Sequence, residues 1–161
     1  MPLHYYLKDV LAGLLIYGTG DTCAALLSGE QSLTRTLGIC LIGGLIYAFE
    51  IPNYFRWIVS RTQLLSPQKR VWLRTSLAIA YFNPLWISRH LAFITLLNGQ
   101  AESLSWHIIY VATQSFLFAL PVTLCANLII QNGLALRFRF IGSALFSSGM
   151  AIYYPLSAAY L

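Results

Sequence analysis

The feature that most constrains this chain is a series of long apolar segments, separated by short connections that carry most of its charge. Five segments hold enough consecutive, mainly apolar residues to cross about 30 Å of hydrocarbon as a helix, at about 1.5 Å per residue. They cover residues 10–28, 37–59, 76–97, 107–130 and 141–161. The sequence therefore predicts an all-α integral membrane protein, with residues 1–161 forming a single bundle of about five transmembrane helices. The last segment is rich in Ser and Ala, so a four-helix bundle stays open.

The small number of charged residues argues against a water-soluble protein. Only 9% of the residues are charged and 58% are hydrophobic, whereas a soluble domain carries about 25% charged residues. The net charge of +5 does not indicate nucleic-acid binding, because the basic residues lie mainly in short connections and no aromatic stacking platform accompanies them. We expect membrane lipids to surround the chain and no nucleic acid to bind it.

The distribution of basic residues orients the predicted helices. In the five-span arrangement only Arg35 lies on one side of the membrane, and Arg89 lies within a span. The opposite side carries eight: Lys8, Arg56, Arg61, Lys69, Arg70, Arg74, Arg137 and Arg139. By the positive-inside rule, the N-terminus lies on this positive, inner face and the C-terminus on the other.

Glycine and proline residues mark the connections between spans and are expected to bend the spans themselves. Ser28-Gly29 and Asn98-Gly99 are typical turn pairs, and Pro67 is placed to begin a short interfacial helix running into Trp72. Four spans each contain one proline, which removes a backbone donor and favours a kink. These are Pro52, Pro84, Pro121 and Pro155. Bent packing and a moving hinge both account for such kinks.

Two stripes of small residues at spacing four predict close helix packing. Small side chains let helix backbones approach and gain dispersion contacts where no hydrophobic effect operates. The first segment carries Gly20, Ala24 and Ser28, and the last carries Ser143, Ser147 and Ala151.

Four ionisable residues fall inside the predicted spans and form a candidate intramembrane polar cluster: Asp21, Glu50, Arg89 and His90. A charge at a helix centre costs about 2.5–3.5 kcal/mol, so these groups should face one another or water rather than lipid. In one interpretation Arg89 pairs with Asp21 or Glu50 and ties helices together. In a second they line a narrow path for small solutes or ions, and in a third His90 serves a proton relay.

No signature of an enzyme or of a cofactor site accompanies these residues. The chain has no Walker-type phosphate loop, no H-E-x-x-H and no G-x-S-x-G. Its three cysteines form no C-x-x-C pair and are expected to be small buried hydrophobes. We expect a non-enzymatic protein with no catalytic, cofactor-binding or metal site, whose bound groups are structural lipids.

Several short motifs follow one another over nearly the whole chain, beginning with Gly18-Thr19-Gly20-Asp21 in the first predicted span and Arg35-Thr36 before the second. Their order and spacing resemble the Mpv-seventeen and twenty-two-kilodalton peroxisomal membrane protein family, which has Gly-x-Gly-Asp and Arg-Thr at these places. The matching positions are Gly18, Gly20, Asp21, Arg35, Pro84, Asn98, Gly99, Pro121, Asn127 and Arg137.

The chain also departs from the family's pattern. Tyr47 stands where the family has a His, Glu50 replaces an aromatic residue, and Leu124 replaces a Gln. Ala78-Ile79 stands for a third-span Asp-Gln. The chain is thus identified as a divergent member.

The resemblance implies a eukaryotic organelle, either the mitochondrial inner membrane or the peroxisomal membrane, and a channel-like role in small-solute homeostasis. The lost polar residues favour an alternative role, as a non-catalytic accessory subunit of a large mitochondrial membrane complex such as a respiratory-chain or ATP synthase assembly. A homo-oligomer, or subunits of such a complex, would then be the partners.

Overall fold

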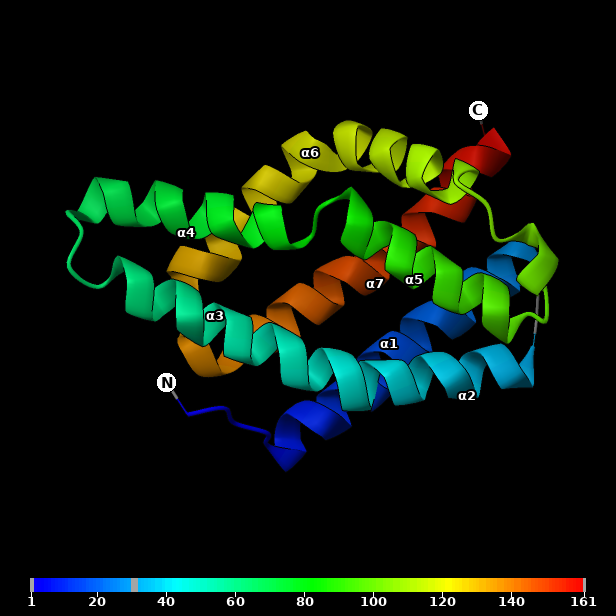
Figure 1. Ribbon diagram of the computed structural model, residues 1–161, viewed down its shortest axis with the longest axis horizontal. Helices are drawn as coiled ribbons and strands as arrows, with labels where there is room; N and C mark the ends of the chain where they lie inside the picture. Colours follow the sequence, from blue (N-terminus) through cyan, green and yellow to red (C-terminus); the bar gives the residue numbers. More distant parts are fainter. Residues whose placement is uncertain (1, 30–31, 161) are drawn as a thin grey trace. The chain divides into compact units, whose positions relative to one another are not determined.

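The computed structural model describes residues 2–29 and 32–160, with side chains described up to Ile152 in the last helix. Over these residues the protein is built from helices, without strands (Figure 1). The elements are α1 (Leu7–Ser28), α2 (Leu33–Leu41), the π-helix η1 (Ile42–Tyr47), α3 (Ala48–Thr62), α4 (Pro67–Tyr81), α5 (Pro84–Leu97), the 3₁₀ helix η2 (Ala101–Ser103), α6 (His107–Gly133) and α7 (Leu136–Tyr160).

The prediction of long apolar helices is confirmed for three stretches of the described chain. Leu7–Ser28, Leu33–Thr62 and His107–Gly133 are long and apolar enough to cross a membrane. The second of these consists of α2, η1 and α3, which follow one another as one continuous helix (Figure 1). The predicted last span falls on α7, and its final residue, Leu161, lies outside the described residues.

The prediction of a continuous third span over residues 76–97 is wrong. The helix ends at Tyr81 and a new one begins at Pro84, because the residue before a proline avoids the helical conformation. Asn83 is extended (ψ 175°), and its side chain accepts hydrogen bonds from the N–H groups of Leu85 and Trp86. Pro84 thus begins a helix instead of kinking one, and α4 extends well beyond the short helix predicted from Pro67.

The other breakers behave differently from Pro84. Pro52 and Pro121 lie inside α3 and α6, which continue through them. Pro155 lies in α7, and its side chain is outside the described part. Gly29 (φ +73°) and Gly99 (φ +72°) adopt the left-handed conformation after α1 and α5, as the turn pairs predict.

The chain forms two compact units. Unit 1 comprises Met1–Tyr54 and Arg137–Leu161, and unit 2 comprises Phe55–Leu136. Unit 1 thus holds α1, α2, η1, the beginning of α3, and α7. Unit 2 holds the end of α3, then α4, α5, η2 and α6.

Unit 1 is organised by close approaches between helix backbones. A Cβ atom on Gly43 of η1 would lie 2.7 Å from the carbonyl oxygen of Gly13 in α1. Gly20 of α1 abuts Ser148 of α7, whose hydroxyl donates to the Ile16 carbonyl at 3.0 Å. Only glycine leaves room for such approaches, so this face of α1 is in contact with both η1 and α7.

Unit 2 is organised around α6, which packs against both α4 and α5. Asn132 on α6 donates from its side chain to the Thr75 hydroxyl of α4 at 3.2 Å. At the break between α4 and α5, the rings of Phe82 and Trp86 pack edge to face at 5.0 Å. Phe55, at the start of this unit, packs its ring 6.5 Å from that of Phe82.

Candidate functional site

The candidate site is a row of buried polar side chains along one side of α1, all within unit 1. Asp9, Gly13, Tyr17 and Asp21 follow one another at spacing four, and all are buried. Spacing four keeps residues on one side of a helix, one above another. At 1.5 Å per residue, Asp9 and Asp21 are about 18 Å apart along the helix axis. A single helix thus carries a buried acid at each end of this row and an aromatic hydroxyl between them.

Asp21 forms a buried ion pair with Arg35 at the α1–α2 end of the row. Both the Nε and a terminal nitrogen of Arg35 lie 2.9 Å from Asp21 Oδ1. The exposed fractions of the Arg35 and Asp21 side chains are 8% and 6%. The other carboxylate oxygen, Oδ2, has no hydrogen-bond partner among the described residues. The pair neutralises two charges inside the protein and leaves one acceptor atom unused.

The local sequence explains why these two residues meet. Gly29 ends α1 in the left-handed conformation, and the Ser32 hydroxyl caps α2 by accepting from the Arg35 N–H. Arg35 is therefore held in the first turn of α2, beside the last turns of α1, with which α2 packs. A cap of this kind contributes about 1 kcal/mol to helix stability.

The middle of the row is formed by two tyrosines. The rings of Tyr17 and of Tyr47 in η1 lie 5.0 Å apart, and Tyr47 is completely buried. The Tyr17 hydroxyl is buried beside Ser147 of α7, without a hydrogen bond of good geometry. Tyr47 belongs to a π-helical turn, a rare feature that occurs frequently at functional sites.

The other end of the row brings together the first turns of α1 and α7. The Lys8 ammonium donates to the Arg137 carbonyl at 3.5 Å, so these turns are neighbours. Asp9 and Arg139, one and two residues further on, are both buried, with exposed fractions of 4% and 6%. Arg139, Ser143 and Ser147 then follow at spacing four along α7. An acid and a base are thus buried at this end as well.

We name this set the unit 1 polar row: Asp9, Tyr17, Asp21, Arg35, Tyr47, Arg139, Ser143 and Ser147. It consists of two acids, two bases and four hydroxyls on helices. Such groups can hydrogen-bond water or a small polar solute, and they can hold charge in a low-dielectric interior. No group of three potential metal ligands occurs among the described residues.

The residues of the predicted polar cluster are distributed over both units. Asp21 lies in the unit 1 polar row, where its ionic partner is Arg35 and not Arg89 or another member of the cluster. Glu50 lies half-buried on α3 in unit 1. Arg89 and His90 lie half-buried on α5 in unit 2, where the His90 ring stacks on Trp86 at 5.9 Å. A cluster of all four remains a prediction.

The predicted packing stripes and family positions occupy several of these contacts. Gly18 abuts the Cys40 side chain of α2, and Gly20 abuts Ser148, next to the predicted Ser147. Ala24 and Ser143 are buried, whereas Ser28 is exposed and Ala151 is half-buried.

The remaining family positions lie outside these contacts. Asn98 and Gly99 form the turn after α5, Pro121 and Asn127 lie in α6, and Arg137 lies exposed at the start of α7.

Sequence reasoning missed three charged members of the polar row. The predicted topology places Arg35 and Arg139 in the connections between spans, and Asp9 lies just outside the first predicted span, residues 10–28. The available signal was the spacing-four series Asp9, Gly13, Tyr17 and Asp21, which places both acids on one side of one helix. Nothing in the sequence alone indicated that Arg35 folds back onto that side.

Comparison of the chain with models of known protein families finds no family that matches. Comparisons with curated proteins and with solved structures find no match either.

Proposed function

We propose that this protein is a non-enzymatic, polytopic membrane protein that allows small polar solutes or ions to pass along the unit 1 polar row. The observation that carries the proposal is the burial of two acids on α1 and one base on α2, in stretches whose apolar length suits a bilayer, together with a second buried base on α7. Charged groups inside membrane segments are costly and characteristically mark pathways for ions, protons or polar substrates. The unused Asp21 Oδ2 is an acceptor available to such a passing group.

The proposal includes a divergent membership of the Mpv-seventeen and twenty-two-kilodalton peroxisomal membrane protein family. What supports it is that two charged residues matched to separate family motifs, Asp21 and Arg35, are each other's partners. Two further matched positions, Gly18 and Gly20, lie where α1 is in close contact with α2 and with α7, respectively. The proposed location is the mitochondrial inner membrane, with the peroxisomal membrane as alternative. The N-terminus is on the positive, inner face.

The test is the permeability of liposomes that contain the purified protein. Wild type should raise the conductance and the flux of small polar solutes above those of empty liposomes. The Asp21→Asn/Arg35→Gln double variant removes both charges together, so no buried charge is left alone. We expect it to fold and to change the ratio of cation to anion permeability, measured as a shift in reversal potential.

A matched comparison separates the polar row from the predicted cluster. Arg89→Gln removes one charge from α5 in unit 2, and Lys8→Gln removes an exposed one from unit 1. The proposal expects both to leave the reversal potential near the wild-type value. An unchanged reversal potential in the folded double variant would refute passage along the row. So would liposomes that are no more permeable with the wild-type protein than without it.

We propose a second candidate, an accessory subunit of a large membrane complex, because α6 is so little covered. Only 6% of the residues in its most apolar stretch are buried, against 39% for α1. Phe118 and Trp106, in α6 and at its N-cap, are 82% and 86% exposed. An apolar helix of this kind can face lipid or pack against a helix of another subunit.

The two candidates differ in native mass. After extraction of the endogenous protein in mild detergent, a native gel with identification by mass spectrometry should place a self-contained pore at one or a few chain masses. Co-migration with a far larger complex would favour the accessory subunit and would identify its partners. Phe118→Ala should then reduce incorporation, and retention at full occupancy would exclude α6 as the interface.

A further inference from the structure

The turn between α3 and α4, in unit 2, carries a concentration of positive charge without acidic residues. Residues 61–74 contain four basic residues, and no Asp or Glu occurs in residues 55–101. Three of the basic residues, Lys69, Arg70 and Arg74, lie in the first two turns of α4. Burial and the neighbouring charge of Arg70 lower the pKa of the Arg74 guanidinium. The local field therefore favours an anion.

The direction of α4 increases this preference. The N-terminal end of a helix is the positive end of its dipole and is normally occupied by acidic residues. The first turn of α4 has none, and it carries Lys69 and Arg70 instead. Such an arrangement is locally unfavourable, and a negatively charged group bound there would offset it.

The basic side chains at this turn have different partners. Arg70 donates to the carbonyls of Gln63 and Leu65, at 3.0 and 2.9 Å, and Arg74 donates to the Thr62 hydroxyl at 2.9 Å. These bonds hold the end of α3 to α4. Lys69 is exposed and makes no hydrogen bond or ion pair with the described residues. Its ammonium is thus available to a ligand.

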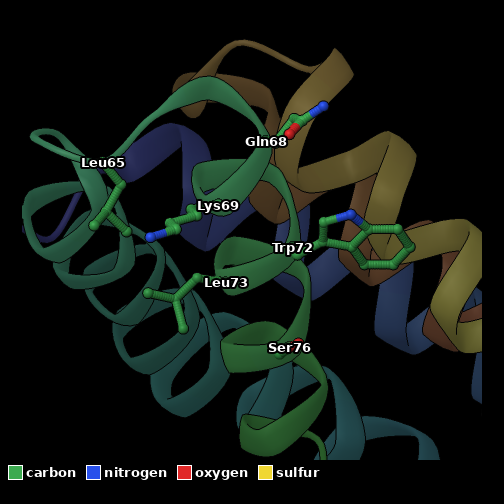
Figure 2. Close-up of a pocket in the computed structure, with 6 residues that line it drawn as sticks. All are labelled: Leu65, Gln68, Lys69, Trp72, Leu73 and Ser76. Carbon is green, nitrogen blue, oxygen red and sulfur yellow. The ribbon is translucent and has the colours of Figure 1, made fainter.

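Lys69 lines an open groove of about 790 Å³ on α4. The other lining residues are Leu65, Gln68, Trp72, Leu73 and Ser76. Figure 2 shows Leu65, Lys69 and Leu73 pointing to one flank of α4, with Gln68 and Trp72 on the other. Trp72 is 57% exposed and Leu73 is 39% exposed. The groove therefore combines one cation and polar side chains with an apolar lining.

We propose that this groove binds an anionic phospholipid of the surrounding leaflet, with Lys69 on the phosphate and with Trp72, Leu65 and Leu73 on the start of the acyl chains. A headgroup of net negative charge matches the excess of basic residues, and clusters of this kind next to membrane helices attract anionic lipids. Tryptophan at a membrane surface typically lies at the level of the headgroups. The inference rests on the proposed membrane location and not on solute passage.

The experiment uses full-length protein in detergent, titrated with dioleoyl phosphatidylglycerol and, separately, with dioleoyl phosphatidylcholine. Retained lipids are counted by native mass spectrometry, and the thermal unfolding midpoint is followed in parallel. We expect phosphatidylglycerol to be retained and to raise the midpoint, and phosphatidylcholine of the same chains to do neither. Lys69→Gln should weaken phosphatidylglycerol binding about fivefold, the effect typical of one basic residue at an anionic membrane surface. Trp72→Ala should weaken it as well.

Arg137→Gln is the matched control, because it removes one exposed positive charge from the same predicted membrane face but from unit 1. It should bind phosphatidylglycerol like wild type. Equal binding of both lipids, or equal loss in the Lys69 and Arg137 variants, would overturn the proposal. So would an equal rise of the midpoint with inorganic phosphate, since the site would then bind phosphate and not lipid. Liposome permeability is read separately, so failure of one proposal does not decide the other.

Discussion

Helices α1 and α6 are both apolar enough to cross a membrane, yet they bury their surfaces in different ways. α1 carries buried Gly13, Gly18 and Gly20 and two buried acids, and 39% of its most apolar stretch is buried. α6 carries no charged residue and large exposed side chains, and only 6% of its most apolar stretch is buried. Hydropathy alone does not distinguish the two. The difference lies in side-chain size and in where polar groups are placed, because close packing in a membrane depends on small residues.

The polar groups of the two units differ in where they lie and in whether they carry charge. In unit 1, the polar row is enclosed among the helices of that unit, and its two acids are balanced by two bases. In unit 2, the basic side chains of α4 point outward or hold a turn, and the buried amides of α6 carry no charge. Substitutions should therefore have large effects on stability in the row of unit 1 and small ones on the exposed surface of α6.

The largest effect is expected from splitting the buried ion pair. Asp21→Ala leaves the Arg35 guanidinium buried without its carboxylate, which should lower the free energy of unfolding by about 3–5 kcal/mol. The Asp21→Leu/Arg35→Met double variant should recover most of this loss, because apolar replacement of a buried pair is often neutral. Denaturant unfolding in detergent measures both. A single variant as stable as wild type would mean that the pair is hydrated and not buried in the membrane.

The next effect concerns the close approach of α1 and η1. A Cβ on residue 13 would overlap the Gly43 carbonyl, so Gly13→Ala should destabilise by about 1–3 kcal/mol, the usual cost of overpacking. Gly149 in α7 is the matched control, since a Cβ there meets nothing within 4 Å. Gly149→Ala should stabilise by about 0.5–1 kcal/mol through helix propensity. If both variants changed the unfolding midpoint equally, the glycine contact would have no special role.

A smaller pair of opposite effects is expected on α6. Gln131 is completely buried, and its amide has no hydrogen-bond partner among the described residues. Gln131→Leu should therefore stabilise by about 1 kcal/mol, because it removes an unsatisfied buried group. Its neighbour Asn132 donates to Thr75 and to the Leu128 carbonyl, so Asn132→Leu should destabilise by about 1 kcal/mol. Destabilisation by Gln131→Leu would show that a water molecule or another chain satisfies this amide.

The sequence predicts the helices well where length and hydropathy decide, as in α1 and α6. It fails at Pro84, where two opposite outcomes follow from the same residue. A proline within an apolar run bends a helix if its neighbours satisfy the freed carbonyl, and it begins a new helix if the preceding side chain caps one. Asn83 caps α5, and a capping asparagine next to proline was the available indication.

The candidate site was less accessible from sequence, for a different reason. Charges can be located along the chain, but their partners depend on how the helices pack. A charge on Asp21 within a span predicts an ionic partner, and one interpretation of the sequence pairs it with Arg89 because both residues lie inside predicted spans. The partner came from the first turn of the next helix, since the Ser32 cap begins α2 early enough to place Arg35 beside α1.

The smallest effect is expected at the exposed surface of α6, and it tests the comparison with the core most directly. Phe118 is 82% exposed, so Phe118→Ala should change the free energy of unfolding of the isolated protein by less than about 0.5 kcal/mol. Phe55 is completely buried, and Phe55→Ala should cost about 3–5 kcal/mol. The same two variants are also compared in native membranes, by their resistance to extraction and proteolysis, to test whether another protein covers α6. If Phe118→Ala is harmless in detergent but damaging in the membrane, another protein covers α6, whereas lipid alone would tolerate the smaller side chain in both settings.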